Sequence, residues 1–187
     1  MILSPEILLW IIVGIVSVSF VFGQVLEYIN LKAMRTDIPA EIASFYDKGK
    51  YEKSQRYHRE TTRFSFLTST VGFTGSLLML LLGGFGWLDG LLRTITENPV
   101  LLALLFFGVL GIASDLLTLP FQWYGTFVIE EKYGFNKTTG KTFITDKLKG
   151  YMLGALIGGG LLAALIYLVD TDRKSTLLNS SHLVISY

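Results

Sequence analysis

The segment GFNKTTGKT at residues 134–142 has the residue types of a phosphate-binding loop, with glycines beside lysine and threonine. In that motif four residues separate the first glycine from the Gly-Lys pair, so that backbone N–H groups and the lysine converge on phosphate. Here five residues separate Gly134 from Gly140. The segment also lacks the preceding buried strand and the following amphipathic helix that would aim backbone amides at a phosphate. The sequence therefore argues against nucleotide binding.

Hydrolysis by a bound metal would need two or three His or carboxylate ligands on one ion, typically two histidines one helical turn apart. The chain has two histidines. His58 lies in a charged segment with no second histidine within a turn, and His182 lies near the C-terminus. A serine elbow motif and cysteine are both absent from the sequence. On residues alone, the chain has no catalytic centre, and we expect it to bind no cofactor or metal.

Asp115 is the one charged residue between Pro99 and Ile129. An acid in the middle of a membrane span costs about 2.5–3.5 kcal/mol on insertion scales, so its side chain should face a bundle interior or water. Such an acid could have a function or line a cavity. It could equally bond hydroxyls such as those of Ser114 and Thr118, or lie near the bilayer interface. The sequence leaves these alternatives open.

The composition around these positions is that of an integral membrane protein. Of 187 residues, 51% are hydrophobic and 17% are charged, and the mean hydropathy is +0.50. A net charge of +1 argues against a nucleic-acid partner, because the polyanionic backbone selects strongly basic faces. The absence of cysteine excludes disulfides and thiolate metal sites. We therefore expect the lipid bilayer as a partner and no nucleic acid.

Four apolar stretches are long enough to cross the roughly 30 Å hydrocarbon core as helices. They lie at residues 7–26, 64–88, 99–129 and 151–169. The first differs from a cleaved signal peptide because Glu6 stands where a basic region belongs and the apolar run is too long. The third would measure about 45 Å as one helix, so it must tilt, protrude or break near Pro120. The predicted fold class is all-α: a polytopic membrane protein with about four transmembrane helices and amphipathic cytoplasmic loop helices.

Basic residues assign the connecting segments to sides of the membrane. Eight Lys or Arg lie between the first two spans, one between the second and third, five between the third and fourth, and two after the fourth. Under the positive-inside rule the rich segments 27–63 and 130–150 are cytoplasmic, and residues 89–98 lie outside. The N-terminus is then non-cytoplasmic. The expected location is a bacterial inner membrane or, in a eukaryote, the endoplasmic reticulum membrane.

Three stretches carry a recognisable pattern: IPAEI at 38–42, YxKSxxYxxxxxRF at 51–64, and LPFQWYGTFVIEEKYGFNKTTGKTFITDKLKG at 119–150. They resemble the N-terminal membrane half of the CAAX prenyl protease 1 family, and the last stretch is highly specific. The resemblance implies an integral-membrane zinc metallopeptidase that cleaves prenylated C-terminal CAAX sequences, with helices enclosing a large water-filled chamber. It covers roughly residues 5–169. The family's zinc-binding HExxH and distant Glu lie C-terminal to that region, so none of them can be placed on this chain.

The segment after the third span is the candidate site that this resemblance implies. We expect its matching residues to shape the cytoplasmic rim of the chamber first and to contact substrate second. Gly134 can take a left-handed turn, and aromatic residues flank it, so the segment should be a packed element rather than a flexible linker. The candidate chamber or rim residues are Asp115, Tyr124, Glu130, Glu131, Asn136, Lys137 and Asp146.

The last residues, DTDRKSTLLNSSHLVISY at 170–187, do not resemble the family and are too short and polar to span a bilayer. We therefore divide the chain into an N-terminal transmembrane domain at 1–169 and an unrelated tail at 170–187, from truncation, frameshift or a chimeric artefact. The predicted function is the chamber-forming portion of a zinc metalloendopeptidase that processes prenylated CAAX-type C-termini or membrane peptides. The resemblance places zinc in the missing C-terminal metalloprotease domain, so the portion alone is expected to be inactive. The alternative is a small non-proteolytic membrane scaffold or transporter-like subunit, in which Asp115 lines a polar path.

Overall fold

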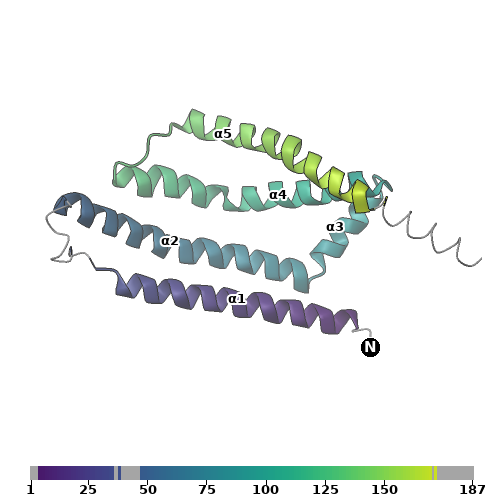
Figure 1. Ribbon diagram of the computed structural model, residues 1–187, viewed down its shortest axis with the longest axis horizontal. Helices are drawn as coiled ribbons and strands as arrows, with labels where there is room; N and C mark the ends of the chain where they lie inside the picture. Colours follow the sequence, from purple (N-terminus) through teal and green to yellow (C-terminus); the bar gives the residue numbers. More distant parts are fainter. Residues whose placement is uncertain (1–3, 36–37, 39–46, 170, 172–187) are drawn as a thin grey trace, which may run out of the picture. The chain divides into compact units, whose positions relative to one another are not determined.

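The structure is a computed structural model that describes residues 4–35, 38, 47–169 and 171 (Figure 1). Its elements are α1 (Pro5–Ala33), α2 (Lys48–Leu81), α3 (Gly84–Arg93), α4 (Pro99–Tyr124), the π-helix η1 (Gly125–Glu130), α5 (Gly140–Leu153) and the π-helix η2 (Gly154–Gly158). Four helical stretches are long and apolar enough to cross a membrane: Pro5–Ala33, Lys48–Leu81, Pro99–Glu130 and Gly140–Val169. The predicted all-α class with four candidate spans is therefore confirmed for the described residues.

The charged segment between the first two spans is helical at both of its described ends, as the predicted loop helices led us to expect. α1 continues to Ala33, and α2 begins at Lys48, well before its apolar run. Side chains cap both helices: Ser4 accepts a backbone N–H bond at the start of α1, and Asp47 accepts two at the start of α2. Such caps satisfy N–H groups that have no partner within the helix. The IPAEI pattern at 38–42 lies outside the described residues, apart from its first position.

The second span ends earlier than the sequence predicted. α2 stops at Leu81, and α3 begins at Gly84. Between them Gly83 has a φ of 69°, a left-handed conformation that glycine adopts without the steric cost of a Cβ. The predicted span 64–88 is therefore wrong at its C-terminal end. Hydropathy missed the turn because apolar residues continue across it.

The third span does not break at its proline. Pro120 lies inside α4, which continues to Tyr124. The helix then passes into the π-helix η1, which extends the helical stretch from Pro99 to Glu130. π-Helical turns are rare and occur frequently at functional sites. Of the three alternatives, a break near Pro120 is therefore excluded, and the irregular part of the helix lies in the next turn.

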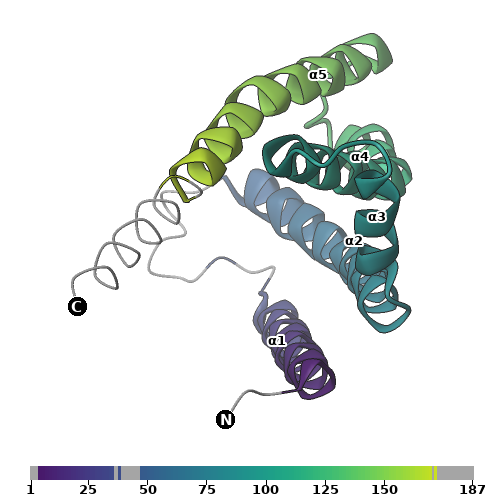
Figure 2. The same ribbon diagram turned by 90° about the vertical axis from the view of Figure 1, so that its right-hand side faces the viewer.

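The chain forms two compact units, and each is described by itself. The first comprises Met1–Phe85 and Ser114–Lys137. In it α1 and α2 run antiparallel along one another (Figure 1, Figure 2). Gln24 Nε2 donates to Ser69 Oγ at 2.8 Å, and the rings of Phe20 and Phe73 stack with centroids 4.1 Å apart. One polar bond and one aromatic pair therefore join two helices whose remaining surface is largely exposed apolar side chain.

The second unit comprises Gly86–Ala113 and Thr138–Tyr187. Its buried core is formed by α3 and the first part of α4, where Leu88, Leu92 and Leu102 are 5–8% exposed. The fourth span approaches α4 at Gly159, where a Cβ would lie 3.6 Å from Leu104 Cδ2. A Cβ at that distance would make an ordinary van der Waals contact, so the approach of the two helices does not depend on glycine here.

The two basic connecting segments meet within the first unit. Arg59 Nη2 donates to the carbonyl oxygen of Met34 at 3.2 Å, at the C-terminal end of α1. Lys53 Nζ lies 5.4 Å from the ring centroid of Phe135, which follows the third span. Because these contacts place both segments at one end of the unit, they must lie on the same side of a bilayer. The positive-inside rule makes that side cytoplasmic, and this assignment stays a prediction.

Single-cysteine labelling tests the predicted topology. Ser54 and Thr94 are both exposed, and the chain has no cysteine that would interfere. In intact cells a membrane-impermeant thiol reagent should label Thr94→Cys and leave Ser54→Cys unlabelled until the membrane is opened. External labelling at position 54 but not at 94 would invert the topology.

Candidate functional site at the end of the third span

The candidate site begins where η1 ends and the chain leaves the predicted membrane span. Ile129, near the end of η1, is 2% exposed. Beyond it the backbone N–H of Gly134 donates to the carbonyl of Glu131, and that of Phe135 donates to the carbonyl of Glu130, both at 2.9 Å. Gly134 has a φ of 64°, which confirms the predicted left-handed turn. These bonds satisfy carbonyls that the end of a helix would otherwise leave unpaired.

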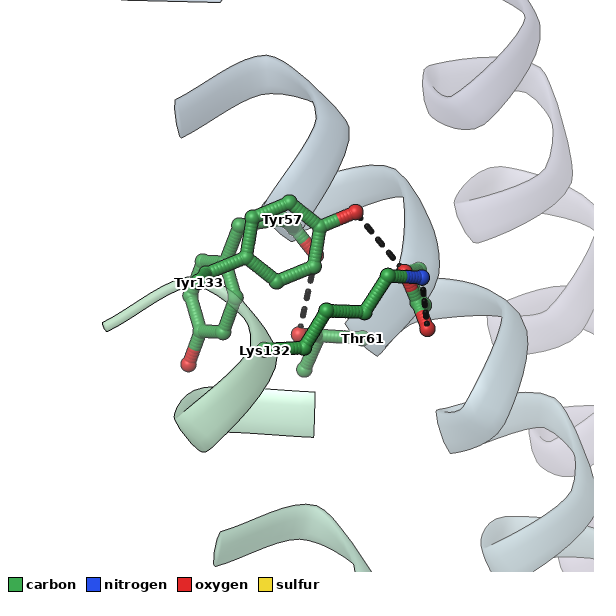
Figure 3. Close-up of polar contacts among 5 residues, drawn as sticks. Tyr57, Thr61, Lys132 and Tyr133 are labelled. Carbon is green, nitrogen blue, oxygen red and sulfur yellow. Dashed lines mark hydrogen bonds and ion pairs between the residues drawn. The ribbon is translucent and has the colours of Figure 1, made fainter. Parts of the chain in front are cut away.

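A carboxylate of α2 binds two successive side chains of this turn (Figure 3). Lys132 Nζ lies 2.7 and 3.0 Å from the two carboxylate oxygens of Glu60, and Tyr133 Oη donates to Oε2 at 2.7 Å. The bond to the Glu60 carboxylate raises the pKa of Lys132 and is also the main cause of a raised pKa at Tyr133. Lys132 therefore stays charged and Tyr133 stays protonated, which are the states that donate to the carboxylate.

Aromatic contacts reinforce this attachment. The ring of Tyr57 on α2 packs edge-on against Tyr133 and Phe135, with centroids 5.5 and 4.8 Å apart. Edge-to-face pairs of this kind contribute about 0.5–1.5 kcal/mol beyond the area they bury. One turn further along α2, Thr61 Oγ1 donates to the carbonyl oxygen of Tyr57 (Figure 3). The turn is therefore packed on α2, as its flanking aromatic residues led us to expect.

The aromatic run at the end of α4 packs on the same helix. Phe64 of α2 lies 6.2 Å from Phe121 and 5.0 Å from Tyr124, measured between ring centroids. Trp123 and Phe127 contact each other at 4.2 Å. The candidate residue Tyr124 is thus held against α2 while 45% of its surface remains exposed.

The candidate polar residues of the turn lie at the surface. Asn136 Nδ2 donates to Glu131 Oε2 at 3.0 Å, and this bond is exposed. Glu130 contributes its carbonyl oxygen, which accepts from the backbone N–H groups of Phe135 and Asn136. Lys137 has an exposed side chain. Because this pair is exposed, its hydrogen bond contributes less to stability than a buried one would.

Two further candidates are not part of the turn. Asp115 Oδ1 accepts from Gln122 Nε2 at 3.1 Å, and the same amide lies 2.9 Å from Thr118 Oγ1. The carboxylate is half-buried on α4 and has a hydrogen-bond donor from its own helix. Asp146 lies on α5 in the second unit, 3.6 Å from Lys149 Nζ. The structure therefore groups Tyr124, Glu130, Glu131, Asn136 and Lys137, and leaves the two aspartates outside that group.

The structure adds three residues of α2 that the sequence analysis did not assign to the site, namely Lys53, Tyr57 and Glu60. Their spacing carried a signal, because residues three or four apart lie on one helix face. Tyr57, Glu60 and Phe64 follow that spacing, and all three contact the end of the third span. The spacing could not predict which residues these side chains would contact. Tyr133, for example, lies 73 residues from its partner Glu60 in the sequence.

The described residues offer no place for a zinc ion, since no group of three or more His, Cys, Asp or Glu converges among them. His58 is an exposed residue of α2. The turn also differs from a phosphate-binding loop, because a π-helix rather than a strand precedes it. A helix does follow it, contrary to expectation: α5 begins at Gly140, and Thr139 Oγ1 accepts from the Thr142 backbone N–H.

Tyr133→Phe removes one bond to Glu60 and keeps the ring. We expect it to lower the free energy of unfolding by about 1 kcal/mol, the usual net value of a hydrogen bond. Denaturant unfolding in detergent measures the change. Tyr28→Phe is the control, because it removes a hydroxyl from an exposed tyrosine of α1. Equal stability of both variants and the parent would show that the Tyr133 bond contributes nothing.

Comparison with known proteins assigns the chain to a family. A family model described as the CAAX prenyl protease N-terminal region, with five membrane helices, matches residues 27–182. The matched range includes the whole candidate turn. It also extends into residues 170–187, which we had expected to be unrelated to the family, and the division at residue 169 stays a prediction.

Individual relatives agree with the family match. A CAAX prenyl protease 1 homolog of Arabidopsis thaliana is 30% identical over 167 residues, covering 85% of this chain and 39% of the relative. A probable CAAX prenyl protease 1 of Schizosaccharomyces pombe is 36% identical over 137 residues, covering 66% of this chain and 29% of the relative. The crystal structure of S. mikatae Ste24p superposes with a TM-score of 0.77 at 29% identity, covering 87% of this chain and 40% of that one.

The chain thus spans about 39% of the Arabidopsis relative and 40% of the Ste24p chain. Because the family model matches well over half of its residues, the chain belongs to the CAAX prenyl protease family and corresponds to that family's N-terminal membrane region.

Proposed function

We propose that the chain is the chamber-forming membrane portion of a zinc metalloendopeptidase that processes prenylated CAAX-type C-termini or membrane peptides, and that it is inactive alone. The observation that carries the proposal is the family match across the spans and the turn. Open-site metal catalysis needs about three protein ligands around one ion. No such set converges among the described residues, so the ligands would have to come from a C-terminal metalloprotease domain.

The turn has a defined part in this proposal. Its backbone is fixed by bonds to Glu130 and Glu131, and its side chains Lys132 and Tyr133 are bound to α2. A segment held in this way can present a constant surface to a neighbouring domain or substrate. We infer that Tyr124, Glu130, Glu131, Asn136 and Lys137 shape the cytoplasmic rim of the chamber, with substrate contact as a secondary role.

A second candidate is a non-proteolytic scaffold or transporter-like subunit. The observation in its favour is the bonded set of Asp115, Thr118 and Gln122 on one face of α4. Polar and ionisable residues inside a span commonly line water-filled paths. In the protease, Asp115 would instead line the chamber, and we assign it that role first.

A chimera tests the protease proposal. Residues 1–169 would be fused to the C-terminal remainder of the Arabidopsis relative, and the parent chain would be purified beside it. We expect the parent to retain no stoichiometric zinc and to leave a prenylated CAAX peptide uncleaved. The chimera should bind one zinc ion and cleave the peptide.

Metal analysis and peptide cleavage are the two measurements. The control is the same chimera with the glutamate of the HExxH motif replaced by glutamine, which should bind zinc without cleaving. Tightly bound zinc in the parent chain would show that its own His58 and carboxylates hold metal. A zinc-loaded, well-folded chimera without activity would favour the non-proteolytic candidate.

In an active chimera, Asn136→Ala and Glu131→Ala distinguish the two roles of the rim. We expect each to lower the free energy of unfolding by up to about 1 kcal/mol and to lower cleavage with it, because their bond is exposed. Lys141→Ala, at an exposed side chain of α5 that is not among the rim residues, is the control. If the two alanine variants kept wild-type stability and zinc content but lost turnover or substrate affinity, the segment would be assigned to the substrate-binding site instead.

A further inference from the structure

One end of the first unit carries an excess of basic side chains. Residues 47–63 and 130–137 together contain eight Lys or Arg and five Asp or Glu. The basic side chains that are exposed form what we call the basic rim: Lys48, Lys50, Lys53, Arg56, Arg63, Lys132 and Lys137. The excess therefore lies on the surface rather than in the interior.

The carboxylates of this end are largely committed to contacts within the chain. Asp47 caps α2, Glu60 binds Lys132 and Tyr133, and Glu131 accepts from Asn136. Glu52 lies 3.9 Å from Arg56, whose side chain is 69% exposed, and such surface pairs contribute little.

Several cations of the rim form no ion pair with another described residue. They are Lys50, Lys53, Arg63 and Lys137. Lys53 instead lies over the ring of Phe135. The rim thus has uncompensated positive charge.

Two residues of the rim adjoin the candidate membrane spans. Arg63 directly precedes the apolar run of α2, which begins at Phe64. Lys132 follows the third candidate span by two residues, since that span ends at Glu130. Tyr57 and Phe135 lie beside these charges, and aromatic side chains are favoured at the membrane interface.

We propose that the basic rim binds the headgroups of anionic phospholipids in the adjacent leaflet. The exposed cations supply the charge complementarity, and the packed rings of Tyr57, Tyr133 and Phe135 give the patch a fixed surface. Basic residues next to a membrane span attract anionic lipids in this way, and the attraction weakens with salt. The proposal rests on the membrane spans and on the rim, and it holds whether or not the full-length protein is a protease.

Fluorescence quenching by brominated lipids tests the proposal on the full chain. Trp123 is the natural probe, because it is 44% exposed and its neighbour Tyr124 packs on Phe64. The other two tryptophans, Trp10 and Trp87, would be replaced by Phe. Vesicles would contain phosphatidylcholine and phosphatidylglycerol in one fixed ratio, with either one or the other brominated. We expect stronger quenching by brominated phosphatidylglycerol after correction for its mole fraction, and a decline of this preference as salt is added.

Substitutions then locate the preference. Arg56→Gln with Arg63→Gln should lower it roughly fivefold for each charge removed. Arg56→Lys with Arg63→Lys should retain it, since attraction to a headgroup requires the charge and not the guanidinium fork. Arg93→Gln is the control, because Arg93 pairs with Asp89 at 2.7 Å and lies outside the rim.

Three results would overturn the proposal. They are equal quenching by the two lipids around the parent chain, a preference that is insensitive to salt, and an unchanged preference in the double glutamine variant. Equal quenching would point to a different occupant, such as an acidic protein. If the glutamine variant failed to insert, the salt series on the parent chain would still decide the question.

Discussion

In a hydrocarbon core no water is available to bond a backbone N–H or carbonyl, so each spanning segment must satisfy its own backbone. The four candidate spans of this chain meet that requirement as helices. The same constraint explains how little of the protein is buried. Leu88, Leu92, Leu102 and Ile129 are the buried hydrophobic residues in the described part of the chain, and α1 buries none. Lipid takes the place that a protein core takes in water.

Because lipid tails solvate apolar side chains as well as other helices do, specific contacts must define which helices pair. Between α1 and α2 these are the Gln24–Ser69 bond and the stacked rings of Phe20 and Phe73. Interhelical hydrogen bonds inside membranes contribute on average only about 0.6 kcal/mol. The densest set of polar and aromatic contacts lies instead at the polar end of α2, around Glu60 and Tyr57.

That arrangement connects the fold to the family's function. The turn after η1 lies within the residues that the family model matches, and α2 holds it in place. In the proposed protease, a turn fixed to α2 would keep the chamber rim in one conformation while the C-terminal domain binds. The chamber rim and the basic rim both depend on the attachment of the turn to α2. Lys132 bonds Glu60 in that attachment, and its exposed ammonium group also belongs to the basic rim.

The sequence by itself determined the membrane class, the number of candidate spans, the all-α fold and the left-handed turn at Gly134, because hydropathy, helix length and glycine conformation are local properties. The family resemblance rested on the same local patterns. Only the tertiary structure decided that Glu60 binds Lys132 and Tyr133. It also ended α2 before Gly83, where the apolar run gives no sign of a turn. A contact across 73 residues depends on how two helices lie beside each other, and residue spacing along one helix fixes its face but not its partner.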